Sequence, residues 1–329
     1  MNKLRVFQNV KRKRTASGFH MRNFGTVLLL LLLLPYIITC LFGNLWQERE
    51  TAGISVMVRE QLGNSRYTVV NMTPLGEERI PLEIYVADRL ARTMGSEYET
   101  ECLKAQAVLI RTNLLGEGNN EIQVEDEQYG KTEVSERYLL AAAETKGVFV
   151  EYQGTPILAA YFLVSGGETR KAEEVLKNSE YPYLSGVSCQ RDFLSEDFAS
   201  TVTYRKKEFE TLWENIKEGK SGELPEIWKD KREAAGGQME MIRDSAGYVI
   251  FFKNNGTWIT GEQFREEYHL PSAHFQVQEE GDEIIFSVKG VGHGIGMSQF
   301  GANEMAKENK SYTEILEYFF KDVSFSKAE

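Results

Sequence analysis

The stretch KGVGHGIGMSQFGA, residues 289 to 302, is the part of this chain whose residue types best suit a functional site. It places His293 between glycines, which allow backbone geometries closed to other residues and let a ligand approach the main chain closely. Two residues able to form hydrogen bonds, Ser298 and Gln299, follow directly. Two interpretations stay open: a loop that contacts a ligand, or a plain turn, which would usually need only one or two glycines.

Other chemistries at this loop are disfavoured by spacing. The remaining histidines, His20, His269 and His274, form neither the i, i+4 pair of a helical metal motif nor a group with two nearby cysteines. No Gly-Lys-Ser/Thr follows the glycines, as a phosphate loop requires. The sequence GMSQFG lacks the G-x-S-x-G spacing of a serine hydrolase. We therefore expect no metal and no cofactor.

Two cations fall on one face of a helix that the sequence predicts from about Glu99 to Leu115. Lys104 and Arg111 are seven residues apart, so both project in nearly the same direction. They are suited to a carboxylate, phosphate or lactyl group, but a solvated face or pairing with nearby acidic residues is the alternative. Gln106 on this helix is open in the same way, as a ligand contact or an interhelix residue. Ser165, before two glycines, presents a hydroxyl on an exposed turn or belongs to a plain turn.

The elements that position these residues form a mixed α and β pattern, so the fold class is predicted as α+β. Apolar residues at helical spacing predict a helix over 82–94 that stops at Gly95, and Ser135 can cap another that ends at residues 146–147. Capping-box spacings at Thr260 and Ser311 predict two further helix starts. Strands are predicted at 148–152 and 157–164, as a hairpin, and at 239–243, 248–252, 274–278 and 283–288.

The polar, glycine-containing stretch 217–237 marks either a domain boundary or an insertion. With its flanks, the insertion interpretation covers residues 193–257, as a smaller subdomain.

The N-terminal residues differ in kind from the rest. Residues 1–23 contain seven Lys or Arg and no acidic residue, and residues 24–43 are apolar and uncharged. Twenty residues at about 1.5 Å each just cross a bilayer core of roughly 30 Å. We therefore predict a basic cytoplasmic tail (1–23), a transmembrane helix (24–43) and an extracytoplasmic domain (44–329) of a single-pass membrane protein. A cleaved signal peptide is the alternative, although no small-x-small cleavage site follows the apolar run.

Charge and cysteine content limit the partners of the domain outside the membrane. Without the tail, 31 basic residues stand against 49 acidic ones, which excludes nucleic acid as an expected partner. Cys102 and Cys189 are too few for a disulfide scaffold. They either pair with each other or are buried small hydrophobes.

Five motifs in one order carry a resemblance. They read LEIYVADRLARTMGSEYETECLKAQAVLIRT (82–112), YFLVSGGETRKAEEV (161–175), YPYLSGVSCQRD (181–192), ITGEQFREEYHL (259–270) and VGHGIGMSQFGANEMAKENKSYTEILEYFF (291–320). Over residues 53–325 the chain resembles the stage II sporulation protein D family, which includes amidase-enhancer proteins. The resemblance implies a membrane-anchored cell-wall protein. It also implies lytic transglycosylase activity on peptidoglycan glycan strands, preferably strands without stem peptides.

The resemblance also identifies site residues. Family members carry a catalytic glutamate eleven residues before the lysine of LKAQA, and that position here is Thr93, whose hydroxyl is no general acid at neutral pH. Phe162 stands where the family has a histidine. The binding positions of the family are kept: Lys104, Gln106, Arg111, Tyr161, Ser165, His293, Ser298 and Gln299.

Three hypotheses follow. The first is a glycan-strand-binding relative, weak or inactive as an enzyme, acting in wall remodelling during sporulation. The second is an active lytic transglycosylase using a displaced carboxylate from Glu83, Asp88 or, as the main fallback, Glu97. The third is a structural or amidase-stimulating partner of a cell-wall amidase or another sporulation protein.

Overall fold

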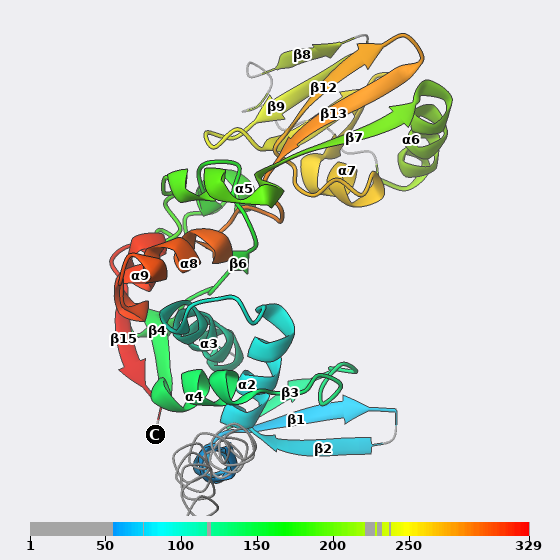
Figure 1. The fold of residues 1–329 in the computed structure, drawn as a ribbon. Coiled ribbons are helices and arrows are strands. Elements are labelled where there is room, and N and C mark those ends of the chain that lie inside the picture. Colours follow the sequence, from blue (N-terminus) through cyan, green and yellow to red (C-terminus); the bar gives the residue numbers. More distant parts are fainter. Residues whose placement is uncertain are drawn as a thin grey trace, which may run out of the picture. The chain divides into compact units, whose positions relative to one another are not determined.

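The computed structural model describes residues 55–74, 76–116, 120–220, 228, 232–236 and 238–328, in which helices alternate with short strands (Figure 1). The predicted α+β class is confirmed. A helical segment at 55–63 comes first, and three helices follow among the first strands: α2 (Leu82–Thr93), α3 (Thr100–Leu115) and α4 (Glu136–Glu144). Helix α2 ends where Met94 turns extended, one residue before the predicted stop at Gly95.

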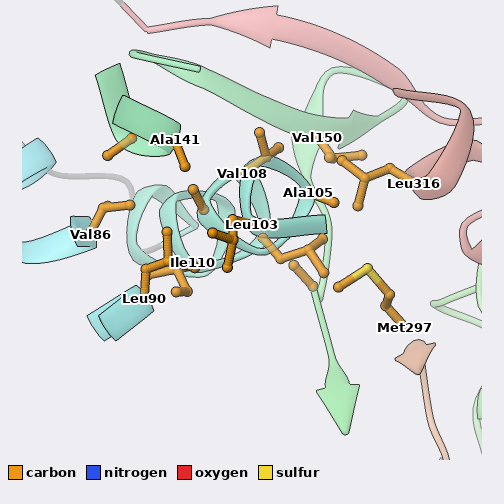
Figure 2. Close-up of a cluster of buried hydrophobic side chains, with 14 of the residues drawn as sticks. Val86, Leu90, Leu103, Ala105, Val108, Ile110, Ala141, Val150, Met297 and Leu316 are labelled. Carbon is orange, nitrogen blue, oxygen red and sulfur yellow. The ribbon is translucent and has the colours of Figure 1, made fainter. Parts of the chain in front are cut away.

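Helix α3 is the centre of the larger hydrophobic core. Eleven of its sixteen residues are buried, because side chains from several elements surround it. Figure 2 shows Leu103, Val108 and Ile110 of α3 among apolar side chains of α2, α4, the following strands and the C-terminal helix. The side chains of Arg111 and Gln106 therefore project from this helix into packed protein rather than into solvent.

Strands flank this helical core in two sheets. The first has the order β2-β1-β3 and contains β1 (Thr68–Thr73), β2 (Gly76–Pro81) and β3 (Glu121–Val124), with β1 and β3 parallel. The second has the order β15-β4-β5 and contains β4 (Val148–Tyr152), β5 (Thr155–Pro156) and β15 (Ser324–Lys327).

A hairpin follows β4 as predicted, but the predicted position of its second strand, 157–164, is wrong. Only the two residues of β5 pair with β4, and β6 (Tyr161–Phe162) instead pairs in parallel with β14 (Met297–Ser298). Side chains satisfy the intervening backbone: Asn113 exchanges two hydrogen bonds with Ala159, at 3.0 and 2.9 Å, and the Tyr183 hydroxyl accepts from the amide of Leu158 at 2.8 Å. Buried peptide groups must find partners, and here those partners are not a strand.

A second hydrophobic core gathers residues from 209 to 288, many of them aromatic. Its first sheet, β11-β10-β9-β8, contains β8 (Glu233–Gly236), β9 (Met239–Arg243), β10 (Val249–Asn254) and β11 (Thr257–Thr260). Its second sheet, β12-β13-β7, contains β7 (Ala199–Arg205), β12 (Phe275–Glu280) and β13 (Glu283–Lys289). With α6 (Lys206–Lys220) and α7 (Gly261–Glu267), these elements extend beyond residue 257, where the predicted insertion ends.

Short helices complete the fold: α5 (Ala172–Leu176), the 3-10 turns η1 (Gln190–Leu194) and η2 (Glu196–Phe198), α8 (Gln299–Lys307) and α9 (Tyr312–Phe319). The capping boxes predicted at Thr260 and Ser311 are both formed. Ser135 precedes α4 as predicted, but its side chain makes no capping bond.

Two predictions depend on the parts of the chain outside these elements. The basic tail (1–23) and the transmembrane helix (24–43) lie outside the described residues, and within the described ones no helix is long and apolar enough to cross a membrane.

Cys102 and Cys189 are both buried and both free, so they do not form a disulfide in this structure.

Candidate functional site

Thr93, the last residue of α2, meets two glutamines from other elements. Its hydroxyl donates to the Arg89 carbonyl one turn back, at 2.9 Å. The Nε2 of Gln299, at the start of α8, lies 3.5 Å from the Thr93 carbonyl oxygen and donates to Oε1 of Gln106 at 3.2 Å. Gln106 is fully buried and Gln299 is 5% exposed. Two motifs that are far apart in the sequence, 82–112 and 291–320, thus meet at Thr93.

One donor of this group has no acceptor. Among the described residues, no hydrogen-bond partner faces Nε2 of Gln106, although the atom is buried. Leaving a buried donor unpaired costs about 1–3 kcal/mol, so such atoms are uncommon in folded proteins. The glutamine pair that contacts the Thr93 carbonyl therefore keeps one buried amide donor free for an added acceptor, such as a carboxylate.

The fallback acid Glu97 lies in the exposed turn after α2 and does not continue the helix. Helix α4 fixes this turn, because Arg137 donates to the carbonyls of Ser96 and Tyr98 and the Tyr138 hydroxyl donates to that of Met94, the latter at 2.9 Å. Glu97 is consequently a solvent-exposed carboxylate on a held turn.

Arg111 and Glu83 form a buried ion pair. The guanidinium has no exposed surface and donates to both Glu83 oxygens, at 2.9 and 2.6 Å, and also to the Val148 carbonyl at 2.9 Å. The amide of Gly147 donates to the same carboxylate at 3.0 Å. Arg111 and Glu83, both named as site residues from the sequence, therefore bond to protein groups inside the core.

Lys104 points elsewhere. Its ammonium lies 2.7 Å from a Glu101 oxygen and 2.6 Å from a Glu144 oxygen. Burial lowers the pKa of Lys104, but the hydrogen bonds to these two carboxylates outweigh it and raise the pKa above its usual range. The structure thus does not bring Lys104 and Arg111 together around one ligand; each is paired with protein carboxylates.

Asp88 belongs to a polar network between α2 and the loop after β3. Arg92 donates to Asp88 at 2.7 Å and to both oxygens of Asp126, at 3.0 and 2.6 Å, and the Tyr85 hydroxyl donates to Asp126 at 2.7 Å. Burial alone would raise the pKa of Asp126, but the bonds from Arg92 and Tyr85 hold it well below its usual value. Asp126 is therefore an ionised acceptor and not a proton donor.

A pocket of about 220 Å³ lies beside these residues. Arg89 on α2 is one turn before Thr93, and Ile110 on α3 is one turn after Gln106, so the pocket begins a helical turn away from the glutamine pair. Apolar side chains of α3 and β3 line one part, and the partly exposed Arg89 supplies a cation. The lining residues are Tyr85, Arg89, Ile110, Asn113, Leu114, Val124, Glu125, Asp126 and Tyr161.

Tyr161 connects this pocket to the histidine loop. The His293 ring packs on Phe162, with centroids 5.6 Å apart, and its Nδ1 accepts from the amide of Ile295 at 3.1 Å. Burial lowers the pKa of His293, although Glu262 and a backbone hydrogen bond with Tyr161 act in the opposite direction. His293 is therefore a half-buried, neutral side chain at neutral pH.

The glycines of the loop have a packing role. Gly294 and Gly296 have φ of 78° and 83°, in the left-handed region. A Cβ at Gly294 would lie 2.6 Å from Tyr248, and one at Gly296 would collide with the Ala160 carbonyl oxygen. The protein's own atoms, rather than a ligand, approach the backbone at these two positions.

Ser165 and Ser298 are joined by a residue that the sequence patterns did not single out. Asp192 of η1 accepts from the Ser165 amide at 2.7 Å and from the Ser298 hydroxyl at 2.8 Å, and all three residues are fully buried. Burial raises the pKa of Asp192, partly offset by these two serines. The only available signal was its place at the end of the motif YPYLSGVSCQRD.

Arg170 is a second residue that sequence reasoning missed. It is 2% exposed and lies 2.5 Å from Asp244 and 2.9 Å from Glu262, and it donates to the His293 carbonyl at 3.2 Å. Its guanidinium also stacks over Tyr248, 4.9 Å from the ring centroid. Arg170 therefore fixes the histidine loop to elements of the second core.

No group of three metal-ligating side chains lies close together anywhere in the described residues. The groups described around the small pocket are hydrogen-bonding amides, hydroxyls and a cation.

The fold and site define a mixed α and β protein with a small polar pocket beside a helix pair, and comparison with known proteins identifies its family. The family model described as "Stage II sporulation protein" matches residues 74–152, which include α2 and α3. Stage II sporulation protein D of Bacillus subtilis (strain 168) is 33% identical over 276 residues, covering 77% of this chain and 76% of the relative. The chain belongs to the stage II sporulation protein D family.

Two further relatives agree with this assignment. Stage II sporulation protein D of Bacillus amyloliquefaciens is 32% identical over 309 residues, covering 85% of this chain and 84% of its own. The protein of Bacillus subtilis (strain 168) named amidase enhancer is 25% identical over 272 residues, covering 69% of this chain and 38% of its own.

Proposed function

We propose that this protein binds peptidoglycan glycan strands during cell-wall remodelling in sporulation and has little or no lytic transglycosylase activity. Family membership and the names of the relatives support a sporulation role linked to the cell wall. We further propose that residues 24–43 anchor it in the cell membrane with the C-terminal domain outside, since the charge pattern favours that orientation.

The observation that carries the proposal is the environment of Thr93. Cleavage of a glycosidic bond needs a carboxylic acid to protonate the leaving oxygen. A threonine hydroxyl bonded to the Arg89 carbonyl does not do this. Gln299 nevertheless contacts the Thr93 carbonyl, and its partner Gln106 keeps one buried donor unpaired. The position keeps the surroundings of an acid without the acid.

The alternative carboxylates give little support to an active enzyme. Glu83 is bound by Arg111, and Asp88 accepts from Arg92 and from the amide of Gly130 at 3.0 Å. Both are buried. Glu97 is the one displaced acid named from the sequence that is exposed.

Binding is assigned to the 220 Å³ pocket. An N-acetylated sugar has an apolar methyl group and a polar amide and hydroxyls. Ile110 and Leu114 offer an apolar surface, while Arg89 and Tyr161 offer polar contacts on the same pocket. Apolar surface next to a few placed polar groups is typical of ligand sites.

The test introduces the acid. The purified full-length chain, as wild type, Thr93→Glu and the uncharged control Thr93→Gln, is incubated with peptide-free glycan strands, and soluble fragments are measured. We expect fragments from Thr93→Glu at about 10²–10⁴ times the rate of the other two proteins. Cleavage by wild type that Glu97→Gln abolishes would instead establish the displaced-carboxylate enzyme.

A second candidate function rests on the relative named amidase enhancer. In that case the protein stimulates a cell-wall amidase. Adding the full-length chain to an amidase on intact walls would raise the rate of peptide release, whereas a glycan-binding protein without this role would leave it unchanged.

A further inference from the structure

Two exposed apolar residues follow Asp192 directly. Phe193 is 56% exposed and Leu194 is 72% exposed, although Asp192 before them is fully buried. The two residues just before them hold the turn in place. Asp192 is bonded to Ser165 and Ser298, and Arg191 makes two hydrogen bonds to Glu308, at 2.9 and 2.6 Å. Large apolar side chains on a fixed surface turn call for an explanation.

The Phe193 ring is also held. It meets Phe198 edge to face, with centroids 4.7 Å apart and planes at 75°. It lies over Gly167 of the Ser-Gly-Gly turn, where an added Cβ would come within 3.2 Å of the ring. Two contacts thus orient an aromatic ring whose remaining surface faces solvent.

We propose that Phe193 is a stacking platform for a pyranose ring of a glycan strand, at a subsite separate from the pocket; this rests on the proposed function. The C–H face of a pyranose is apolar and flat enough to pack on an aromatic ring, while its hydroxyls stay in water. An oriented, exposed ring needs little further ordering when a sugar binds.

Continuity with the candidate site supports a glycan rather than another occupant. Ser298, which bonds to Asp192, is followed by Gln299, which contacts Thr93 and Gln106. Phe193 is therefore connected, through Asp192, Ser298 and Gln299, to the residues of the candidate site.

Membrane and protein partners fit less well. Glu196 and Asp197, three and four residues after Phe193, are exposed, and the chain has a net charge of −11; both oppose contact with an anionic lipid surface. One phenylalanine and one leucine are far less than the roughly 800 Å² per partner of a stable protein interface.

The test compares ligands of different length. Binding of the full-length chain to long peptide-free glycan strands and to a short chitooligosaccharide is measured for wild type, Phe193→Ala, Phe193→Trp and Leu194→Ala. We expect Phe193→Ala to weaken binding of long strands about threefold to tenfold and to leave the short ligand unchanged. Phe193→Trp should bind like wild type, as should Leu194→Ala, the matched apolar control. Circular dichroism verifies the fold of each variant.

Several results would overturn the inference. Equal binding of long strands by Phe193→Ala and wild type would show that Phe193 is not a stacking platform. An equal loss in Leu194→Ala would indicate a general apolar contact, and an equal loss for short and long ligands would indicate a structural change. If wild type binds no strand at all, the proposed function itself fails, which is distinct from a loss confined to Phe193→Ala.

Discussion

At the scale of single residues, the charged groups of this protein divide into those that hold the fold and those that remain open to a ligand. Arg111 has no exposed surface and is matched by Glu83, because removing a charge from water is costly unless a partner and further hydrogen bonds compensate for it. Arg89 lies 3.6 Å from Asp126, but it lines the pocket and keeps part of its side chain exposed to a ligand. A motif match identified the first cation, whereas only the structure identified the second.

Replacing Glu83 tests the structural role of the buried pair. Glu83→Gln leaves the Arg111 charge without a counter-ion, so we expect the free energy of unfolding to fall by about 3–5 kcal/mol. Glu97→Gln, the exposed control, should change it by no more than about 0.5 kcal/mol. Urea denaturation measures both. An unchanged free energy of unfolding in Glu83→Gln would contradict the structural role.

Asp126 predicts a pH dependence of stability. Its folded-state pKa lies below the ordinary value near 3.9, so the ionised carboxylate favours folding above that value, and this contribution is lost as pH falls through the folded pKa. Between about pH 5 and pH 2, wild type should therefore lose more free energy of unfolding than Asp126→Asn. Parallel pH profiles for the two proteins would contradict this assignment.

At the scale of elements, helix starts and strand pairings were not equally predictable. Capping boxes at Thr260 and Ser311 lie within four residues of sequence, so the pattern found them and the structure confirmed them. The strand predicted over 157–164 failed because its backbone partners, the Asn113 and Tyr183 side chains, are remote in sequence. A periodic pattern does not reveal which distant side chain will satisfy a peptide group.

The same reason explains what was missed at the site. The partner of Arg170, Asp244, lies 74 residues further along the chain, and Asp192 bonds to Ser298 across 106 residues. Family motifs contained Arg170 and Asp192, but their roles depend on contacts that spacing does not encode. His293, by contrast, stood out because its glycine neighbours are local.

Helix α8 allows a matched pair of cap mutations. The Ser298 hydroxyl accepts from the Gly301 amide and donates to Asp192, whereas the Ser311 hydroxyl of α9 serves a cap at an exposed position. Ser311→Ala should cost about 1 kcal/mol of unfolding free energy, and Ser298→Ala about 1–3 kcal/mol more because Asp192 loses a partner. Equal losses in urea denaturation would show that the Asp192 bond contributes nothing.

At the scale of the whole molecule, two hydrophobic cores share one compact unit, Met57–Glu329. Contacts of Arg170 with Asp244, Glu262 and the His293 carbonyl join the histidine loop to elements of the second core. The second core therefore has a role in placing the loop, in addition to its own stability.

Removing Arg170 should affect the whole unit. Arg170→Met leaves Asp244 buried without its cation, so we expect a fall of about 3–5 kcal/mol in the free energy of unfolding. Arg265→Met, which breaks a more exposed pair with Glu262, should cost no more than about 1 kcal/mol. Equal, small effects of the two substitutions would show that Arg170 does not join the loop to the second core.

The central claim is that this family member binds glycan strands without cutting them. The most direct measurement incubates the full-length wild-type chain with peptide-free strands and follows strand co-sedimentation and soluble fragments in the same sample. We expect strands to co-sediment with the protein and no fragments to be released. Fragments released by wild type, or strands that fail to co-sediment, would contradict it.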